Sequence, residues 1–455
     1  MRVAILGFGF SGAMLAANLA RLAEEPLELY LIDPTHDARG AAYGTTNAGH
    51  LLNVRATNMG AFADAPGGFA EWLLSDEGKY AAARRKIALP GPQDFAPRAL
   101  YGDYLADIWQ RTQSEAQSKR LSLKLVPARA TRIERQGDGT LAVSTDRGDA
   151  IAVDAAVLAT GVEPRPILTH LPPESVVQRP WKDGALAHAG KFMGPVVLVG
   201  TGLTAIDALI SLRDVGYTGE VVALSRRGLW PLPHAENAGP YHFEPAALQG
   251  RSPVQLLRTI RRAAKAHMAQ GGDWRAVIDA LRPHTQALWL RWDSAQQRKF
   301  LARLLPYWNV HRHRVAPSIA ARLDAERAAG TLRTIAGGRV AATVAEGRAQ
   351  LEILRGGEPE MLQPSLIVNC TGPELNPAKS AHALLPQLLQ SGMAEAHANG
   401  IGFAGDRHGR LFGAALPNLY AIGAPLTGQL LESTAVPELR VQAQNVAKQI
   451  LSGRA

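Results

Sequence analysis

The chain of 455 residues is too long for one ordinary hydrophobic core and long enough for two or three domains. With 46% hydrophobic and 20% charged residues it has the composition of a folded protein, which excludes a disordered or collagen-like chain. Its 49 Lys and Arg exceed its 40 Asp and Glu, and the net charge of +9 predicts an anionic partner: nucleic acid, a membrane surface or a small ligand. The single cysteine, Cys370, excludes an internal disulfide framework, a CxxC redox pair and a cysteine-rich zinc site.

The apolar run over residues 3–20 resembles an export signal only in its hydrophobicity. It contains three glycines in a regular pattern and leads into a second apolar stretch at 27–32 without a convincing cleavage site. Elsewhere the sequence has no window of about 20 uninterrupted apolar residues. We therefore expect no membrane span and a cytoplasmic location.

The N-terminal segment has the pattern of a strand, a helix and a second strand. Residues 2–6 and 27–32 predict buried strands, and residues 11–22 have helical apolar spacing. The turn Gly7-Phe-Gly-Phe-Ser-Gly12 separates the first strand from the helix, and Asp33 ends the second strand. Such a turn, followed by an acid about 20 residues later, predicts a dinucleotide site.

Each residue type in this unit has a physical role. Gly7 permits a tight turn, Gly9 lets the backbone approach a pyrophosphate, and Gly12 allows the helix to pack closely on the strand. Ser11 lies in the first turn of the helix, where free N–H groups bind phosphate. Asp33 would accept a hydrogen bond from a ribose hydroxyl.

A second unit of the same kind begins near residue 195. Its turn is Gly200-Thr-Gly-Leu-Thr-Ala205, between a strand at 195–200 and a helix, and a further strand covers 220–224. The predicted nucleotide contacts in the turn are Gly200, Gly202, Thr204 and Ala205, the last of which replaces the third glycine.

The second unit ends on Ser225, Arg226 and Arg227, where the first unit ends on an acid. An acid would repel a 2′-phosphate, whereas paired arginines can bind one through charge-assisted hydrogen bonds. The second nucleotide is therefore predicted to be NADPH rather than NADH. The alternative interpretation is that Arg226 and Arg227 are solvated surface charges.

The segments that follow the two units are also alike. Residues 123–161 and 332–372 contain alternating strands separated by turns, and each segment closes with a hydrophobic strand that ends in Thr160-Gly161 or Thr371-Gly372. This repeat predicts an α/β fold of two Rossmann-like dinucleotide-binding domains with β-rich crossovers.

The distribution of predicted strands and helices suggests where each domain begins and ends. The first would comprise residues 1–165 and 360–455, and the second residues 190–359, with a helical insertion at about 250–327. The insertion has a basic helix face, which we interpret as solvated or as a cover over the active site. No recognition motif accompanies it, which argues against a nucleic-acid partner.

In these features the chain resembles the two-dinucleotide-binding-domain flavoproteins, which include flavin monooxygenases, N-hydroxylases and pyridine-nucleotide disulfide reductases. The first unit matches their FAD-binding element and the second their nicotinamide element. Within this class the chain is most similar to a bacterial group of FAD/NAD(P)-binding proteins, through segments at 42–44, 50–54, 97–98, 101–104, 223–228, 311–314 and 432–440.

The resemblance implies further FAD contacts after the ribose acid. In the class this region covers the span from adenylate to flavin, which makes Tyr43, His50 and Asn53 candidate flavin-site residues. The alternative is an ordinary loop with a buried tyrosine and a capping asparagine.

Near the C-terminus the chain departs from the class. Many members carry Gly-Asp where this sequence has Gly423-Ala424, and their aspartate contacts the ribityl chain of FAD. Backbone N–H groups at Gly423 and at the start of the last helix, near Thr434 and Ala435, would then hold the cofactor.

The candidate substrate contacts are Arg55, Arg98, Arg312 and His313. Arg55 could reach the pyrophosphate or an acidic substrate. If residues 311–314 form a strand, the two histidines share one face and the two arginines share the other. An anion site and a salt-bridged cluster are both open interpretations, and a metal site would need a third ligand that we do not identify.

Two branches of the class are disfavoured. Disulfide reductases need a cysteine pair, and Cys370 lies alone in an apolar strand that is typical of an inert core thiol. The signature of ketone-oxygenating members should carry a histidine before the second turn, where this chain has Gln178 ahead of Trp181.

We therefore predict an FAD-dependent oxidoreductase that NADPH reduces, and specifically a monooxygenase. It would use molecular oxygen to insert one oxygen atom at nitrogen or sulfur of a small polar substrate such as an amino acid. One alternative is an NADPH-dependent flavin reductase that passes electrons to a quinone or a protein. The other is a non-catalytic nucleotide sensor. Dinucleotides as ligands also account for part of the basic charge without nucleic acid.

Overall fold

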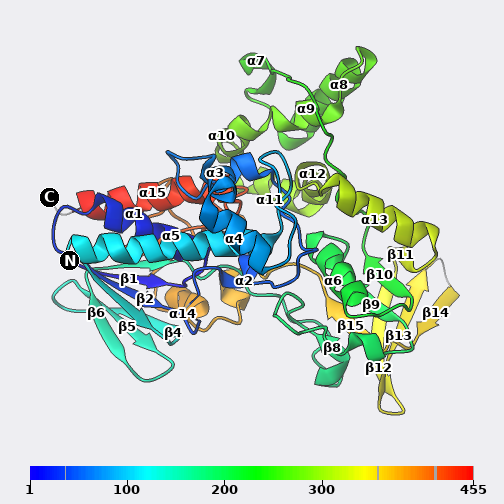
Figure 1. The fold of residues 1–455 in the computed structure, drawn as a ribbon, viewed down its shortest axis with the longest axis horizontal. Helices are drawn as coiled ribbons and strands as arrows, with labels where there is room; N and C mark the ends of the chain where they lie inside the picture. The colour runs from blue at the N-terminus through cyan, green and yellow to red at the C-terminus, as the bar shows by residue number, and fades with distance from the viewer. Residues whose placement is uncertain (36, 356–357, 415–417, 454–455) are drawn as a thin grey trace.

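Two five-stranded parallel sheets form the two halves of the molecule (Figure 1). They are seen in a computed structural model that describes residues 1–35, 37–355, 358–414 and 418–453. The predicted α/β class with two Rossmann-like halves is confirmed.

The first sheet has the strand order β16-β7-β1-β2-β3. Its strands are β1 (Arg2–Leu6), β2 (Glu28–Ile32), β3 (Ser122–Val126), β7 (Ala155–Leu158) and β16 (Leu419–Ala421). The core helices on one face are α1 (Phe10–Leu22), α5 (Arg98–Ser118) and α15 (Val436–Ser452). The other face is covered by β4 (Ala130–Arg135), β5 (Leu141–Thr145), β6 (Ala150–Val153) and α14 (Leu384–Gln390).

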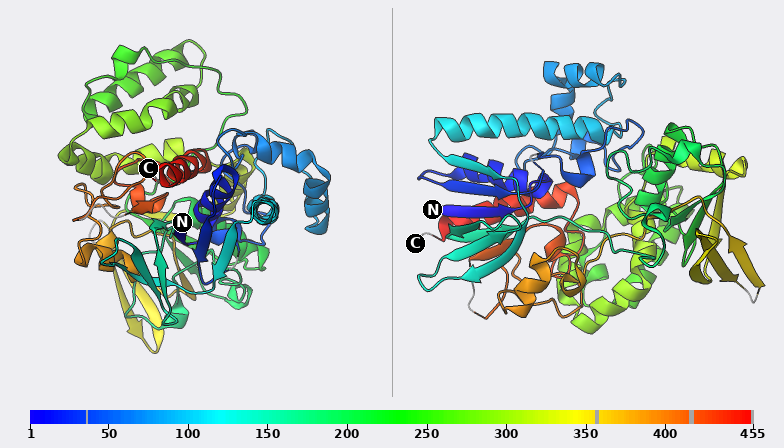
Figure 2. Two further views of the ribbon diagram at one scale, coloured as in Figure 1. Left: turned by 90° about the vertical axis from the view of Figure 1, so that its left-hand side faces the viewer. Right: turned by 90° about the horizontal axis from the view of Figure 1, so that it is seen from below.

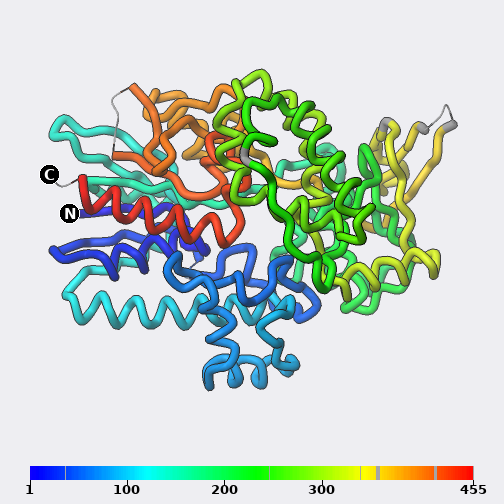
Figure 3. Tube along the Cα trace, turned by 90° about the horizontal axis from the view of Figure 1, so that it is seen from above, coloured from blue at the N-terminus to red at the C-terminus, as the bar shows by residue number. Residues whose placement is uncertain are grey.

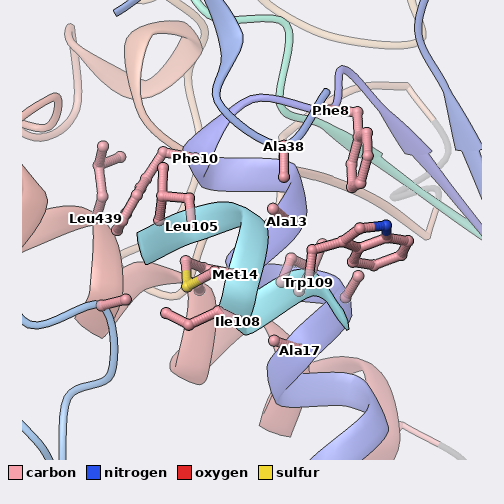
Figure 4. Close-up of a cluster of buried hydrophobic side chains, with 14 of the residues drawn as sticks. Phe8, Phe10, Ala13, Met14, Ala17, Ala38, Leu105, Ile108, Trp109 and Leu439 are labelled. Carbon is pink, nitrogen blue, oxygen red and sulfur yellow. The ribbon is translucent and has the colours of Figure 1, made fainter. Parts of the chain in front are cut away.

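Alternation along β1 explains why both faces are covered. Val3 and Ile5 join the core under the helices, whereas Ala4 and Leu6 join the core on the opposite face. Figure 4 shows the helix-side cluster, in which small residues such as Ala13 let α1 approach α5 closely. The resulting fully buried strand fixes the position of the turn that follows it.

The second sheet repeats this plan with the order β8-β15-β9-β10-β11. Its strands are β8 (Val176–Val177), β9 (Val196–Val199), β10 (Val221–Ser225), β11 (Leu332–Ala336) and β15 (Leu366–Asn369). On one face lie α6 (Leu203–Asp214) and α13 (Pro317–Ala328), and on the other lie β12 (Arg339–Ala345), β13 (Arg348–Arg355) and β14 (Glu358–Leu362). Four strands of each sheet have the same order, β7-β1-β2-β3 and β15-β9-β10-β11, and together with the similar antiparallel crossover this supports a duplication of one module.

The sheets correct the expected domain boundaries. Leu366 of β15 pairs with Val196 of β9, so the strand that was expected after a boundary at 360 lies in the second sheet. Residues 176–177 also belong to that sheet, ahead of the expected start at 190. The pairing of Leu419 with Ala156 returns the chain to the first sheet. We therefore propose that the second module extends from β8 to β15.

The predicted helical insertion stands between β10 and β11 and rises above the two sheets in Figure 1. Its helices are α7 (Pro245–Leu248), α8 (Pro253–Ala269), α9 (Trp274–Asp279), α10 (Thr285–Arg291), α11 (Ser294–Arg303) and α12 (Leu305–Arg312). Figure 2 shows the insertion beside the C-terminal helix α15, and an ion pair of 3.0 Å between Arg282 and Glu438 joins the two regions.

The remaining helices belong to the long connection after β2. They are α2 (Gly40–Tyr43), α3 (Gly68–Leu74) and α4 (Asp76–Arg84). The N-terminus and the end of α15 lie at the same outer edge of the first module (Figure 3), which places the carboxyl ends of its parallel strands toward the second module.

Candidate functional site

The first glycine-rich turn has the conformation that its sequence predicts. Gly7 has a φ of 108°, and a Cβ at this position would lie 2.3 Å from the carbonyl oxygen of Ala159. A Cβ on Gly12 would lie 2.0 Å from the oxygen of Gly7. Both positions therefore require glycine, the first for its left-handed backbone and the second for the close approach of helix to strand.

The start of α1 offers unpaired backbone donors. The first helical hydrogen bond runs over 2.9 Å from the nitrogen of Ala13 to the oxygen of Gly9, which is the N-cap residue. The amides of Phe10, Ser11 and Gly12 precede this bond and have no acceptor within the helix. They form a suitable cradle for a pyrophosphate.

Thr160 supplies an independent indication that a ligand belongs here. Its Cα would lie 3.1 Å from a Cβ on Gly7, and its buried Oγ1 has no hydrogen-bond partner among the described residues. Gly161 follows with a φ of 66° and open space where a Cβ would be. Because buried hydroxyls are nearly always paired, an orphaned one beside the turn fits a dinucleotide with its many hydroxyls and phosphate oxygens.

Asp33 is held against the turn at the end of β2. Its Oδ2 accepts a hydrogen bond of 2.9 Å from the nitrogen of Phe8, and its Oδ1 accepts two from Thr35, at 2.7 and 2.6 Å. A carboxylate has about four lone-pair positions, so Asp33 keeps acceptor capacity for a ribose hydroxyl.

The segment after β16 lies beside the first glycine-rich turn. Gly423 has a φ of 79°, and a Cβ on it would lie 3.4 Å from Oγ of Ser11. The Ser433 hydroxyl donates a 2.9 Å hydrogen bond to the oxygen of Gly423, which brings the residues before α15 alongside. Thr434 is exposed there, and Ala435 is the N-cap of α15 without a side-chain cap.

The second module has the same arrangement of backbone. Gly200 has a φ of 119°, and its Cβ would lie 2.2 Å from the oxygen of Cys370, just as Gly7 meets Ala159. Gly202 caps α6 and has open space around it. The two sites differ at the strand end, because Oγ1 of Thr371 donates a 2.8 Å hydrogen bond to Oδ1 of Asn369, whereas the hydroxyl of Thr160 is unpaired in the described structure.

The other predicted contacts of the second turn are also in place. Thr204 lies in the first turn of α6, Ala205 is completely buried at the position of the third glycine, and Gly372 has a φ of 91° with open space around it. A methyl group is therefore accommodated where the first module needs Gly12.

Ser225 and the two arginines after it have separate roles. Oγ of Ser225 accepts a 2.8 Å hydrogen bond from the nitrogen of Gly228 and a 3.0 Å bond from the Thr201 hydroxyl, so it shapes the turn. Arg226 is exposed, and the guanidinium of Arg227 lies 5.7 Å from the ring centre of Tyr307. Among the described residues neither arginine has a carboxylate within salt-bridge distance, which leaves both charges available to an anionic ligand.

Of the three residues expected near the flavin, Tyr43 lies beside the first turn. Its ring centre is 4.6 Å from that of Tyr101 and 6.4 Å from that of Phe10 at the start of α1. Burial raises the pKa of the Tyr43 phenol to about 12, so the side chain stays neutral at physiological pH.

His50 and Asn53 instead join the two modules. The His50 ring binds Oγ1 of Thr45 at 2.9 Å through Nδ1, and the oxygen of Asp207 at 3.0 Å and Oγ of Ser211 at 2.9 Å through Nε2. The carbonyl oxygen of Asn53 accepts a 3.0 Å hydrogen bond from Nε2 of His234. The contacts of His50 do not support the flavin contact that we expected.

The two arginines predicted to bind an anion in this region are also structural. Arg98 forms a 2.7 Å ion pair with Asp207 of α6 and donates to the oxygen of Leu51. Arg55 donates to three backbone oxygens, of Gln93 at 2.6 Å, Ala235 at 3.1 Å and Glu236 at 2.9 Å. Both therefore tie the first module to elements of the second.

The expectation of a strand at residues 311–314 is wrong. Residues 305–312 form α12, in which the alternation used to pair the two histidines does not apply. Arg312 pairs with Glu432 at 3.3 Å, and Arg314 pairs with Asp279. Desolvation lowers the pKa of the His313 imidazole. The salt-bridged interpretation is thus the one the structure supports, and no cluster of potential metal ligands is present in the described ranges.

Glu432 is a further residue of this region, to which the sequence motifs assigned no role in the site. It has a φ of 61°, and its Oε1 accepts a 2.7 Å hydrogen bond from Nε1 of Trp308. Its only sequence signal was its place at the start of the shared segment 432–440. The contact could not be predicted because Trp308 and Glu432 are far apart in the chain.

Comparison with known proteins agrees with this geometry. Residues 4–163 match a family model described as FAD-NAD(P)-binding. No curated protein matches the sequence. We also find no candidate membrane span among the helices of the described ranges.

Several solved structures share the fold over nearly the whole chain. L-lysine 6-monooxygenase from Pseudomonas syringae is similar with a TM-score of 0.67 and 18% identity, covering 100% of this chain and 99% of that one. Ornithine N-hydroxylase from Kutzneria, solved with reduced FAD, NADP⁺ and L-ornithine, has a TM-score of 0.63 and 15% identity, with coverage of 100% and 99%. Bacillithiol disulfide reductase from Bacillus cereus has a TM-score of 0.57 and 14% identity and covers 100% of both chains.

The family model and the shared fold agree with the dinucleotide binding that the two glycine-rich turns predict. The chain has the fold of the two-dinucleotide-binding-domain flavoproteins, and its residues 4–163 match a family of FAD-NAD(P)-binding proteins.

Proposed function

We propose that this flavoprotein is an NADPH-dependent monooxygenase that transfers one oxygen atom to nitrogen or sulfur of a small polar substrate such as an amino acid. The observation that carries the proposal is that the two modules have similar glycine-rich turns, beside which stand side chains of opposite charge. An acid, Asp33, stands at the end of β2 beside the first, and two arginines with no carboxylate partner among the described residues stand at the end of β10 beside the second. The solved lysine and ornithine monooxygenases with the same fold support the choice of reaction.

In the first module the protein would hold FAD mostly through its backbone. The amides at the start of α1 would bind the pyrophosphate, and Asp33 the ribose. The hydroxyl of Thr160, which has no partner among the described residues, would donate to or accept from the cofactor beside Gly7. FAD, when bound, supplies hydride acceptance from NADPH and activation of molecular oxygen.

In the second module the turn from Gly200 to Ala205 would bind the pyrophosphate of NADPH, and Arg226 and Arg227 its 2′-phosphate. The contacts of His50, Arg98 and His234 would hold the two modules at a fixed distance, so that the two ring systems meet between them.

Cys370 does not support the chemistry of the disulfide-reductase relatives. It lies at the end of β15 and is 5% exposed, and burial raises the pKa of its thiol far above the ordinary value. A buried, protonated thiol without a second cysteine cannot perform dithiol exchange. Dithiol exchange is therefore not part of the proposed function, in which the electron acceptor is oxygen.

The proposal is tested by supplying NADPH and isotopically labelled oxygen and measuring where the oxygen goes. A monooxygenase yields a product that has gained one labelled atom. A flavin reductase instead oxidises NADPH while a quinone or protein is reduced, and a nucleotide sensor oxidises none.

A further inference from the structure

The helical insertion holds an apolar cavity of about 700 Å³ that is partly open to solvent. Helices α8 to α12 form its walls, and residue Leu431, from the segment before α15, closes one side. Its aromatic lining includes Trp274, Trp292, Phe300 and Trp308. Protein interiors rarely leave voids much larger than a water molecule, whereas sites for small molecules measure about 300–1,000 Å³ and are mostly apolar. The size and lining of this cavity are therefore those of a ligand site.

The cavity has few polar groups, and most of them are already bonded. The Thr285 hydroxyl donates to the oxygen of Leu281 at 3.1 Å, and Nδ1 of His311 is 2.8 Å from the oxygen of Tyr307. Arg261 is different, because it is exposed and has no carboxylate within salt-bridge distance in the described part of the chain. It provides a free positive charge at the edge of an apolar space.

The helical spacing of α8 places Arg261 next to apolar residues that line the cavity. Leu257, Ile260, Arg261 and Ala264 all line the cavity, and their spacing of three and four residues puts them on one face of the helix. Other basic residues of α8, such as Arg258 and Arg262, do not line it. Arg261 is thus the one arginine of this helix that lines the cavity.

The cavity adjoins the candidate FAD site through three consecutive residues. Leu431 lines the cavity, Glu432 accepts the hydrogen bond of Trp308, and Ser433 donates to the oxygen of Gly423. Gly423 in turn lies against Ser11 at the start of α1. A molecule in the cavity would therefore lie behind the segment that borders the first cradle.

We infer that this cavity binds the apolar part of the substrate, and that the substrate is an amphipathic amino acid whose carboxylate pairs with Arg261. The apolar body would replace contact with water by contact with the tryptophan and leucine side chains, and the carboxylate would make a charge-assisted pair with the guanidinium. That the bound molecule is the substrate rests on the proposed oxygen-transfer function, whereas the binding itself does not.

Calorimetric titration of the FAD-loaded protein tests the binding, with octanoate, 1-octanol and acetate as probes. We expect octanoate and 1-octanol to bind and acetate not to bind. The substitution Arg261→Gln should weaken octanoate about tenfold, the order expected for a charge-assisted pair, and change the affinity for 1-octanol by less than about twofold. Equal losses for the two probes would refute the role of Arg261.

A matched pair of substitutions on α8 tests the location. Ala264→Trp places a large side chain in the cavity and should reduce octanoate affinity by about tenfold or more. Ala266→Trp puts the same side chain on the exposed side of the same helix and should have no effect. Equal affinities of the two variants, or no octanoate binding by the unmodified protein, would overturn the inference. Because the titration requires no turnover, a protein that binds octanoate without transferring oxygen would contradict only the proposed function.

Discussion

The indole nitrogen of Trp308 donates a 2.7 Å hydrogen bond to Oε1 of Glu432, while Nε of Arg312 lies 3.3 Å from Oε2 of the same carboxylate. One helix of the insertion thus holds both oxygens of a single residue in the segment before α15. Glu432 has a left-handed φ of 61°, a conformation that costs a residue with a side chain about 1 kcal/mol or more. The two contacts offset this cost and fix the segment between the cavity and the candidate FAD site.

Removing this carboxylate should destabilise the protein strongly. The side chains of Arg312 and Glu432 are 11% and 6% exposed, so Glu432→Ala leaves a buried guanidinium unpaired, at a cost of about 3 kcal/mol. Denaturant unfolding measures the loss. Asp324→Ala, which breaks an ion pair whose carboxylate is 74% exposed, should cost less than about 0.5 kcal/mol. Similar losses for the two variants would show that Glu432 is not a structural anchor.

The two strand-end threonines offer a second matched comparison. Thr160→Val removes a hydroxyl that has no partner in the described structure, so it should leave stability unchanged and weaken FAD binding about fivefold. Thr371→Val breaks the bond to Asn369 and should reduce stability by about 1 kcal/mol without affecting FAD. Flavin fluorescence and thermal unfolding separate the two effects. Unchanged FAD affinity in Thr160→Val would argue against a cofactor contact there.

The cofactor preference should depend on the arginines that follow β10. Arg226→Ala and Arg227→Ala should each raise the dissociation constant for NADPH about tenfold and scarcely change that for NADH, because only NADPH carries the 2′-phosphate. Titration of each reduced nucleotide measures the two constants. Arg262→Ala, an exposed arginine on α8, serves as the control. Equal effects on both nucleotides would mean that these arginines are only surface charges.

The stability of the protein should fall in mild acid. Desolvation, together with the nearby Arg314 guanidinium, lowers the pKa of His234 to about 4, from an ordinary value of about 6.5. Below pH 6.5 the unfolded chain therefore takes up a proton that the folded protein resists, so stability that is full above this pH declines as the pH falls toward 4. His234→Gln should flatten the decline between these pH values in denaturant unfolding. An unchanged pH profile would exclude His234 as a source.

The parts of the site that follow from local sequence were predictable. Gly7 and Gly200 occupy the same position in two repeated units, and they share a left-handed backbone with φ values of 108° and 119°. A turn between a buried strand and a helix imposes this geometry through its own covalent constraints. The helical character of the insertion was predictable for a similar reason, since apolar spacing along α8 is a local property.

The parts that depend on how the modules meet were not predictable. His50 and Arg98 both contact Asp207 on α6, which lies more than 100 residues away in the chain, and nothing near either residue indicates that helix. The four residues 311–314 are too few to distinguish alternation from helical spacing, and in place of the strand considered there His311 and Arg312 end α12 and His313 caps it.

The fate of molecular oxygen during NADPH oxidation tests the proposed function most directly. The FAD-loaded protein would be incubated with NADPH, isotopically labelled oxygen and a set of amino acids and amphipathic amines, and the products analysed by mass spectrometry. We predict a product that has gained one labelled oxygen atom at nitrogen or sulfur. Recovery of all consumed oxygen as hydrogen peroxide, with no oxygenated product, would contradict the proposed monooxygenase.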